Sequence, residues 1–488
     1  MTARTSQSSA DDPREWGRAE EMTAFEALMW RAEADPVLRS HMTAVEILDC
    51  VPQWERLVAA HEWATRTVPR FRERVVEPLF NLGPPVWAAD GGFDLTYHLR
   101  RASLPAPGGM RELLDFVQAI GMAPLDTARP QWEAVLVEGL EGDRAAYVLK
   151  LNHALTDGLG AIQLLEMIHS RRREPTPDKL QVPPAPPAQP NPARLLARQL
   201  ARRGAGAPHG VAQMALAGVS RAVRGLGHPD KAVGEAVDYA RSLRRVLGPP
   251  PVDGSPLLKN RSHSWWFAAH DVPLVDLRAA AKAAGGSVND AYLAALLGAF
   301  RRYHEHFGVA IEAMPIAIPI STRGGDDSKG GNRIAGARFA APVGEPDPEE
   351  RIRLVRELVI AARAEPAMDA LSLVAPIVSR LPGPLVTRLG RSGTAANDLQ
   401  ASSVPGIRHA AFIAGAKVTH MYPFGPLPGC AAMVTLVSHA GTCCVGANVD
   451  RAAFTDTALF GACLAEGFDE VLALAQGQST PTTKEKTG

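Results

Sequence analysis

The chain has 488 residues, of which 46% are hydrophobic and 21% are charged. This length exceeds what one ordinary hydrophobic core accommodates, and the composition is that of a globular protein, so two domains are expected. Lysine plus arginine and aspartate plus glutamate both total 52, so no overall basic charge is available to recruit nucleic acid.

The N-terminal sequence gives no sign of secretion. Residues 1–16 are polar and contain no apolar signal-peptide core. No uninterrupted apolar run reaches the about 18 residues that a membrane-spanning helix requires. The five cysteines show no metal-ligand spacing, which predicts a reduced protein with no metal site. We therefore expect a cytoplasmic protein, and peripheral contact with the inner face of the membrane or with a lipid-droplet surface stays open.

Five segments are predicted along the chain from composition and hydrophobic pattern. They are a disordered N-terminus (1–20), an N-terminal α/β domain (21–174), a proline-rich linker with a basic helical connector (175–260), a C-terminal α/β domain (261–475) and a disordered tail (476–488). Within the connector, leucines alternate with arginines, as in a helix that lies on a membrane surface. A solvated linker helix explains the same pattern equally well.

The first half is predicted to be mostly helical over 21–74, with a strand over 43–48, and helical again over 111–122. Two β-rich runs, 132–138 and 145–151, flank a loop of glycine and acidic residues, which is typical of a β-hairpin. A short apolar helix is expected over 161–168. In the second half, strands are predicted over 264–268, 315–319, 338–342, 431–437 and 443–449, and helices over 274–284, 288–303, 349–364 and 455–474.

His153 is the first residue of interest for chemistry. It leaves the second strand of the predicted hairpin and enters a short loop that ends at Asp157 and Gly158. An unperturbed imidazole titrates near pH 6.5 and can move protons at neutral pH. A histidine at a strand end is also a common structural residue, but functional groups concentrate in such loops.

Asp157 has two compatible roles. It can cap the helix that begins near Gly158, because an aspartate at this position accepts a bond from a free backbone N–H. It can also hold the loop, and therefore the imidazole, in place without touching a substrate. We favour this positioning role over direct proton transfer, and we expect Gly158 to permit a sharp backbone turn.

The segment Asn152-His153-Ala154-Leu155-Thr156-Asp157-Gly158 resembles the HHxxxDG motif of the CoA-dependent acyltransferase superfamily. The superfamily's first histidine is replaced by Asn152, whereas its second histidine, the catalytic base, is kept as His153. Asn152 and Gly158 are therefore expected to support the motif.

Other segments resemble the wax ester synthase/diacylglycerol acyltransferase family within that superfamily. The first half contains a PLxxxRPLWE-like segment over 124–133, with Gln131 in place of leucine. The second half contains Asn289-Asp290, like the family's ND motif, Gly331-Asn332, like its GN motif, and an NVPG-like segment over 403–406. The likeness extends in the right order over roughly residues 22–472.

The resemblance implies the fold and the reaction. It implies an α/β fold of two condensation-domain-like (chloramphenicol-acetyltransferase-like) sandwich domains with a tunnel at their interface. It also implies transfer of a long-chain acyl group from acyl-CoA to an alcohol, either diacylglycerol or a fatty alcohol, with His153 as general base and no acyl-enzyme. Acyl-CoA is then a co-substrate, the acceptor is hydrophobic, and no cofactor is needed.

Asn289 and Asp290 have two interpretations. Both residue types favour a helix N-terminus. The resemblance places Asn289 near His153, across the domain interface, where its amide would bind the acyl carbonyl or the acceptor. Asp290 is the other substrate or oxyanion candidate of this pair, and a structural role is favoured for it. The loop over 321–325 and the Gly330-Gly331-Asn332 segment are interpreted first as turns and second as substrate contacts.

Two further functions stay open at this point. The first is acyl transfer onto a specialised alcohol or amine outside storage lipid. The second is a non-catalytic protein that binds acyl chains or lipids on an acyltransferase scaffold.

Overall fold

The structure is a computed structural model that describes most of the chain. The described residues are 16–79, 83–176, 179, 182–183, 191–201, 241–242, 244–245, 248, 250–321, 332, 334–365, 375, 378–379, 381, 383–394 and 397–477.

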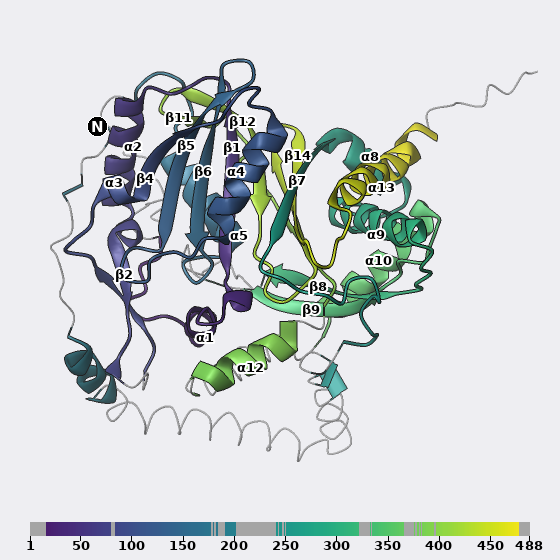
Figure 1. Ribbon diagram of the computed structural model, residues 1–488, viewed down its shortest axis with the longest axis horizontal. Coiled ribbons are helices and arrows are strands. Elements are labelled where there is room, and N and C mark those ends of the chain that lie inside the picture. Colours follow the sequence, from purple (N-terminus) through teal and green to yellow (C-terminus); the bar gives the residue numbers. More distant parts are fainter. Residues whose placement is uncertain are drawn as a thin grey trace, which may run out of the picture.

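A six-stranded mixed sheet forms the centre of the first half, in the order β11-β12-β1-β6-β5-β4. Its strands are β1 (His41–Leu48), β4 (Leu99–Ser103), β5 (Trp132–Leu140), β6 (Arg144–Asn152), β11 (Phe412–Ile413) and β12 (Ala416–Phe424). A separate pair, β2 (Glu73–Val76) and β3 (Val86–Ala89), lies at its side (Figure 1).

A second six-stranded sheet has the order β7-β14-β13-β10-β8-β9. Its strands are β7 (Trp265–Pro273), β8 (Met314–Ser321), β9 (Ile334–Ala341), β10 (Leu399–Val404), β13 (Ala432–His439) and β14 (Thr442–Asp450). β10 runs parallel to β13 and β8, and the other neighbours are antiparallel.

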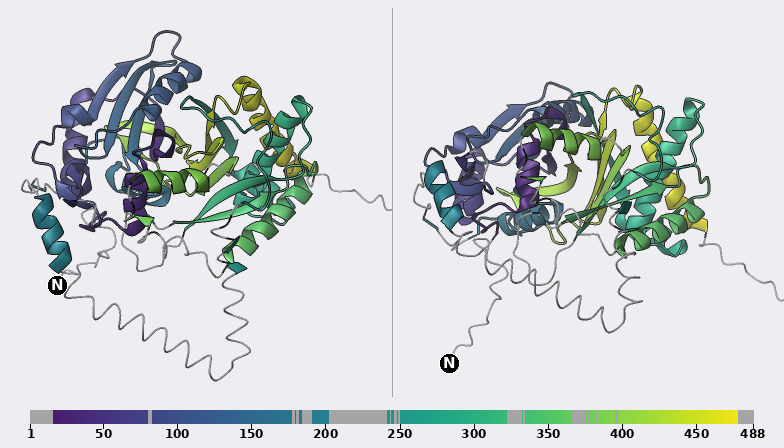
Figure 2. Two further views of the ribbon diagram at one scale, coloured as in Figure 1. Left: turned by 60° about the horizontal axis from the view of Figure 1, so that its bottom comes forward. Right: turned by 90° about the horizontal axis from the view of Figure 1, so that it is seen from below.

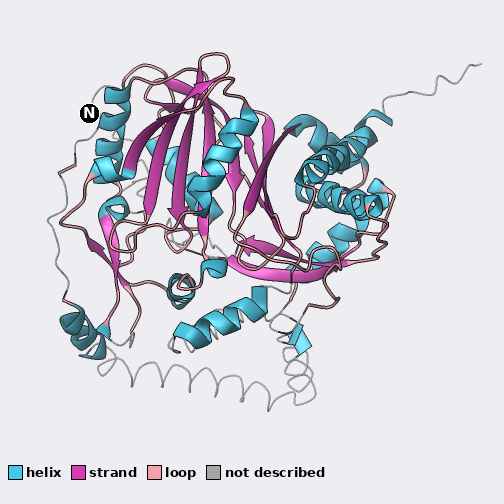
Figure 3. Ribbon diagram, viewed as in Figure 1, coloured by secondary structure: helices cyan, strands magenta, loops and turns pink. Residues whose placement is uncertain are grey.

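Helices pack against both sheets (Figure 3). Those of the first half are α1 (Ala24–Ala32), α2 (Trp54–Thr67), α3 (Leu95–His98), α4 (Met110–Met122) and α5 (Gly158–Ile168), with 3-10 turns at Pro36–Leu38 and Pro69–Arg72. Those of the second half are α8 (Leu274–Ala283), α9 (Val288–His306), α10 (Pro348–Arg363), α12 (Gly383–Thr394) and α13 (Thr457–Gly477). The elements predicted from sequence in each half are confirmed to within a few residues.

The predicted β5–β6 hairpin forms because its loop contains residues that tolerate a left-handed backbone. Gly139, Gly142 and Asp143 have φ angles of 80°, 74° and 55°. β6 is buried along nearly its whole length. The hairpin therefore delivers the residues after Asn152 to a fixed place at the edge of the first sheet.

The two halves do not separate at residue 261, as the predicted division implied. β12 lies in the second half of the sequence but pairs with β1 in the first sheet, with Thr43 opposite Phe424 and Glu46 opposite Met421. α12 also packs on α1, as the lower part of Figure 1 and the views in Figure 2 show. The pattern of a strand predicts its conformation but not its partner, so the sequence did not reveal this exchange.

Two further expectations need correction. Trp16 falls in the terminus predicted to be disordered, yet its side chain is 1% exposed and packs in the first-half core, because the indole is large and apolar. In the predicted connector, Leu195 is buried against Val76 and Val86, so it is not available to a membrane surface. Residues 202–240 of that connector lie outside the described residues.

A cluster of buried apolar side chains joins the two halves. It combines the inner face of the first sheet and α4 with Phe267 of β7 and Phe424 of β12. The two phenyl rings stack with centroids 4.1 Å apart and planes 5° apart, and both are at most 2% exposed. This contact fixes the second sheet against the first.

Replacing Phe424 with alanine should lower the free energy of unfolding by about 3–5 kcal/mol, because it removes a buried ring and leaves a cavity at the junction. Urea unfolding followed by tryptophan fluorescence measures the loss. Phe307→Ala is the matched control, since that ring is 41% exposed, and it should change stability by less than the junction variant. Equal losses in the two variants would show that the junction does not depend on this ring pair.

Candidate active site

The loop between β6 and α5 carries His153. Its backbone is anchored to the loop before β1, because the His153 N–H donates to the Ser40 carbonyl oxygen at 2.8 Å. The neighbouring Asn152, Ala154 and Asp157 are buried, whereas the His153 side chain is only partly buried. The structure therefore fixes the loop firmly and leaves the His153 side chain partly exposed.

Asn332 holds the His153 ring. The imidazole Nδ1 lies 2.9 Å from Asn332 Oδ1, and Asn332 Nδ2 donates to the His153 carbonyl oxygen at 2.6 Å. Because the amide oxygen only accepts, Nδ1 carries the proton in this pair. The neutral ring then has an unprotonated Nε2.

Asn332 is itself fixed from the first half. Its backbone N–H donates to Glu26 Oε1 at 2.9 Å, and Glu26 Oε2 accepts from Thr23 N, also at 2.9 Å. Thr23 and Glu26 form the capping box of α1. The Glu26 carboxylate thus caps the N-terminus of α1 and also holds Asn332, a residue of the second half, against His153.

Asn152, at the position of the superfamily's first histidine, is fully buried and supports the loop. Its Oδ1 accepts from Ala154 N at 2.8 Å, and its Nδ2 donates to Glu33 Oε2 at 3.0 Å. Glu33 also accepts from both the N–H and the hydroxyl of Ser40, whose carbonyl binds His153. The expectation that Asn152 supplies supporting hydrogen bonds agrees with this geometry.

Glu33 is a charged centre in this network. Burial alone would raise the pKa of the Glu33 carboxyl. The hydrogen bond and charge of His41 and the hydrogen bonds from Ser40 lower this pKa by more, so the net pKa lies below its ordinary value. The His41 Nε2 is 3.4 Å from Glu33 Oε2. The carboxylate is therefore ionised at neutral pH and is a strong acceptor for Asn152.

Asp157 caps α5, as predicted. Its side chain accepts from Gly160 N at 2.8 Å and is 2% exposed. The Trp16 indole Nε1 donates to the Gly160 carbonyl oxygen at 3.1 Å, which fixes the same helical turn from outside. Both contacts position the loop that carries His153.

The reason for Gly158 differs from the one expected. No left-handed φ angle is recorded at this glycine. A Cβ added here would lie 3.2 Å from Val404 Cγ2 at the end of β10, a closer approach than most side chains tolerate. Gly158 therefore permits close contact with the NVPG-like segment rather than a sharp turn.

The ND motif lies at the start of α9. Asp290 forms a capping box with Ser287 and is 3.4 Å from Arg356 on α10, and both contacts support the fold. Among the described residues, no recorded hydrogen bond joins Asn289 to His153, and the bonds recorded for the His153 side chain and carbonyl go to Asn332. The assignment of Asn289 to the acyl carbonyl stays a prediction.

The structure adds little about the remaining candidate residues. Residues 322–331, which include most of the loop over 321–325 interpreted first as a turn and second as a substrate contact, lie outside the described residues. His439 is buried, and its Nε2 lies 3.0 Å from the Val418 carbonyl oxygen. Within the part of the chain that the structure describes, no group of acidic, cysteine or histidine side chains could hold a metal ion.

Sequence reasoning missed the contacts that three residues make around His153. Asn332 was identified in a GN-like motif but interpreted first as a turn residue and second as a substrate contact, and neither Glu26 nor Glu33 was singled out. The Thr23-x-x-Glu26 spacing is a recognisable capping box, so Glu26 had a local signal. Its second contact with Asn332 joins residues 306 positions apart and had none.

The fold has two mixed sheets, the first of which takes β12 from the second half of the chain, and the loop that carries His153 lies at their junction. This arrangement is a condensation-type fold. The structure matches a wax ester synthase/diacylglycerol acyltransferase from Marinobacter aquaeolei VT8 with a TM-score of 0.60 and 22% identity, over 93% of this chain and 100% of that chain. It matches the first condensation domain of the calcium-dependent antibiotic synthetase with a TM-score of 0.59 and 17% identity, over 93% and 96% of the two chains. The predicted fold class is confirmed.

The chain belongs to the wax ester synthase/diacylglycerol acyltransferase family. The family's catalytic-domain model matches residues 20–292 and its C-terminal-domain model matches residues 330–471. A Mycobacterium tuberculosis protein named as a diacylglycerol O-acyltransferase is 42% identical over 474 residues, which cover 96% of this chain and 94% of that protein. A second M. tuberculosis protein of the same description is 30% identical over 88% of this chain and 91% of its own length.

The protein is accordingly an acyl-CoA-dependent O-acyltransferase, as the sequence predicted. None of the helices that the structure describes combines the length and the apolar character needed to cross a bilayer.

Replacing Asp157 with alanine should cost about 0.5–2 kcal/mol of stability, because the first turn of α5 loses its cap. Thermal unfolding measures the change. Asp157→Ser keeps an oxygen at the capping position and should recover most of the loss. If serine and alanine destabilise the protein equally, capping is not what this carboxylate contributes.

Proposed function

We propose that this protein transfers a long-chain acyl group from acyl-CoA to the hydroxyl of diacylglycerol or a fatty alcohol, with His153 Nε2 as general base and no acyl-enzyme. The names of the M. tuberculosis relatives and of the Marinobacter protein support these two acceptors.

The observation that carries the proposal is the contact between His153 and Asn332. Asn332 Oδ1 keeps the proton of the neutral ring on Nδ1, so Nε2 is the nitrogen that can accept a proton. A base that works near pH 7 needs this unprotonated nitrogen in an accessible position.

The reaction proceeds in one acyl-transfer sequence. Nε2 takes the hydroxyl proton as the acceptor oxygen attacks the thioester carbonyl, which forms the new C–O bond. The C–S bond then breaks, and the imidazolium returns the proton to the leaving thiolate. Atoms and charge balance with acyl-CoA and the alcohol alone, so the cycle requires no metal or redox cofactor.

Several effects share the rate enhancement. Proton transfer by a positioned histidine contributes about 10²–10⁴-fold. A donor to the developing oxyanion contributes about 3–4 kcal/mol, and we assign this role to Asn289 or to a backbone N–H of the loop. Holding both substrates in line supplies much of the rest. Asp157, Asn152 and Gly158 act by fixing the loop.

His153→Ala should lower kcat by about 10²–10⁴-fold, because the hydroxyl would then lose its proton without a base. Thiol release from palmitoyl-CoA, measured with diacylglycerol, hexadecanol and shorter alcohols and amines as acceptors, gives the rate and the acceptor class together. His306→Ala is the matched control, since His306 is an exposed histidine at the end of α9, and it should retain full activity.

Unchanged turnover in His153→Ala would remove this residue as the base. If the wild-type protein turned over only the shorter alcohols or the amines, its acceptor would be a specialised alcohol or amine rather than diacylglycerol or a fatty alcohol. If palmitoyl-CoA binds but no acceptor releases thiol, the chain is a lipid-binding protein on this scaffold.

Asn332→Asp should raise the pKa of His153, because a carboxylate beside Nδ1 favours the imidazolium. The base must be deprotonated to act, so the rising limb of the kcat/KM profile should move to higher pH. Asn332→Ala removes the restraint on the tautomer and should cost a share of the same 10²–10⁴-fold without that upward movement. A residue that only stabilises the fold would lower activity equally in both variants and leave the limb in place.

A further inference from the structure

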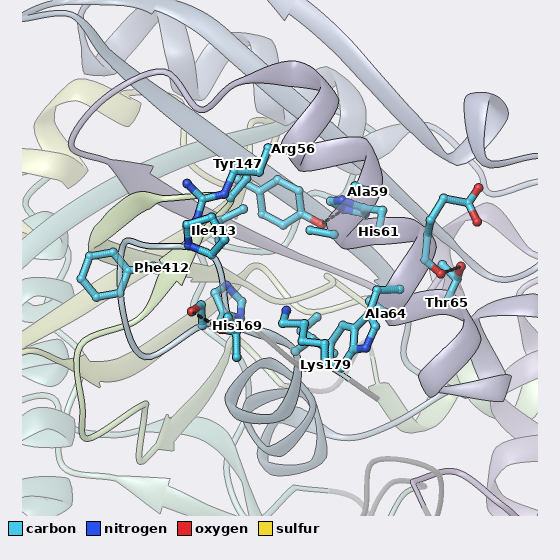
Figure 4. A pocket seen from close by; sticks show the side chains of 18 of the residues that line it. Arg56, Ala59, His61, Ala64, Thr65, Tyr147, His169, Lys179, Phe412 and Ile413 are labelled. Atoms are coloured by element: carbon cyan, nitrogen blue, oxygen red, sulfur yellow. Dashed lines mark hydrogen bonds between the residues drawn. The ribbon is translucent and has the colours of Figure 1, made fainter. Parts of the chain in front are cut away.

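A cavity of about 730 Å³ lies on the outer face of the first sheet, between α2, the end of α5 and β11. Its size is within the about 300–1,000 Å³ typical of small-molecule sites. Figure 4 shows side chains from these elements converging on it.

The walls of this cavity are mainly hydrocarbon. The large apolar side chains that line it are Trp132 and Leu149 of the first sheet, Phe71, Ile168 at the end of α5, and Phe412 of β11. Helix α2 contributes small side chains, Ala59, Ala60 and Ala64, which leave the space open. Such a lining favours an apolar guest.

The polar groups among these walls are already paired. Tyr147 donates its hydroxyl proton to His61 Nε2 at 2.8 Å, and His61 Nδ1 donates to the Leu57 carbonyl oxygen at 2.9 Å (Figure 4). Burial lowers the pKa of His61 to about 4, so this ring is neutral at physiological pH. The pair therefore presents no charge to a guest.

His169 is the second polar group of the lining. Its Nδ1 donates to the Leu165 carbonyl oxygen at 2.7 Å and its Nε2 to Glu46 Oε2 at 2.9 Å. Burial lowers the pKa of His169, but the charge and hydrogen bond of Glu46 raise it by more. This buried pair is neutral overall, so nothing in the interior attracts a charged group.

Two basic side chains, Arg56 and Lys179, line the cavity. Arg56 donates to the carbonyl oxygen of the exposed Arg173, and the Lys179 Nζ lies 4.1 Å from the centre of the Trp63 ring. Burial lowers the pKa of Lys179, and the nearby positive charge of Arg56 lowers it further. An anion placed by these two cations would relieve their repulsion.

Acidic lining residues do not cancel this charge. Glu62 pairs with Arg66 at 3.1 Å and with Arg72 at 3.0 Å. Glu174 is exposed, where its charge is screened by solvent. An anionic head beside Arg56 would therefore meet net positive charge.

The cavity is distinct from the His153 loop. No residue from 152 to 158 lines it. It lies at the C-terminal end of α5, whereas His153 precedes the N-terminal end, and a helix of 11 residues separates these ends by about 16 Å.

We propose that this cavity is a second ligand site, which binds a single-chain anionic amphiphile with its hydrocarbon chain among Trp132, Leu149 and Phe412 and its anionic head beside Arg56 and Lys179. A long-chain fatty acid has this chemistry. The site does not depend on the role proposed for His153, and it would give the enzyme a place for a free acyl chain away from the reacting groups.

Photo-crosslinking on the full chain tests the site directly. Diazirine-labelled palmitate should form adducts in the α2 peptide (54–67) and around 412–414, and unlabelled palmitate should compete for them. Ala60→Phe, which fills the cavity, should reduce these adducts by about tenfold or more. Ala279→Phe on the exposed face of α8 is the matched control and should leave them unchanged.

The head group is tested with Arg56→Glu. Palmitate adducts at α2 should fall by about tenfold, because an ion pair becomes a like-charge contact, whereas adducts of diazirine-labelled hexadecanol should persist. Arg278→Glu, on exposed α8, is the control. Adducts confined to peptides around His153, or undiminished in Ala60→Phe, would overturn the site. Equal loss or equal retention of both probes in Arg56→Glu would overturn the anionic head.

Thiol-release assays on the same variants keep the two proposals apart. Ala60→Phe and Arg56→Glu should retain acyl transfer, and His153→Ala should retain the α2 adducts. Either proposal can thus fail while the other stands.

Discussion

The contact between Asn332 and His153 is the interaction on which the rest of the site depends. The Asn332 side-chain amide accepts from the His153 ring through Oδ1 and donates to the His153 backbone carbonyl through Nδ2. The orientation of the ring and the position of the loop are therefore fixed together. The amide belongs to the second half and the histidine to the first. The tautomer that leaves Nε2 unprotonated therefore requires both halves to be docked. The β12 exchange and the stacked Phe267 and Phe424 rings maintain that docking.

Helix α1 connects the support on both sides of the loop. Glu26 in its first turn binds Asn332, and Glu33 at its C-terminal cap binds Asn152. Both carboxylates are largely buried, so an unpaired partner would cost more than the bond contributes. A displacement of α1 would loosen the ring and the backbone of His153 at the same time. A nine-residue helix far from the motif in sequence thus controls its geometry.

Local features of the site could be predicted from the sequence, and contacts between distant segments could not. The β5–β6 hairpin and the Asp157 cap depend on neighbouring residues, and both were found. Asn332 was taken for a turn residue because its partners lie 179 and 306 positions away. Gly158 was expected to permit a sharp turn, but its small size instead leaves room for Val404, which approaches from the other sheet. Periodicity gives the conformation of a segment, and only tertiary packing gives its neighbour.

Asn152 in place of a histidine has a physical consequence in this setting. His41 lies opposite Asn152 in the β1–β6 ladder, and its Nε2 is 3.4 Å from Glu33 Oε2. A second imidazole at position 152 would compete with His41 for that one carboxylate, and two protonated rings beside it would repel each other. The amide donates to Glu33 and accepts from Ala154 without titrating, so these bonds persist across the pH range in which histidines change charge. The substitution therefore preserves the support of the loop and leaves His153 as the only histidine at the motif's two histidine positions.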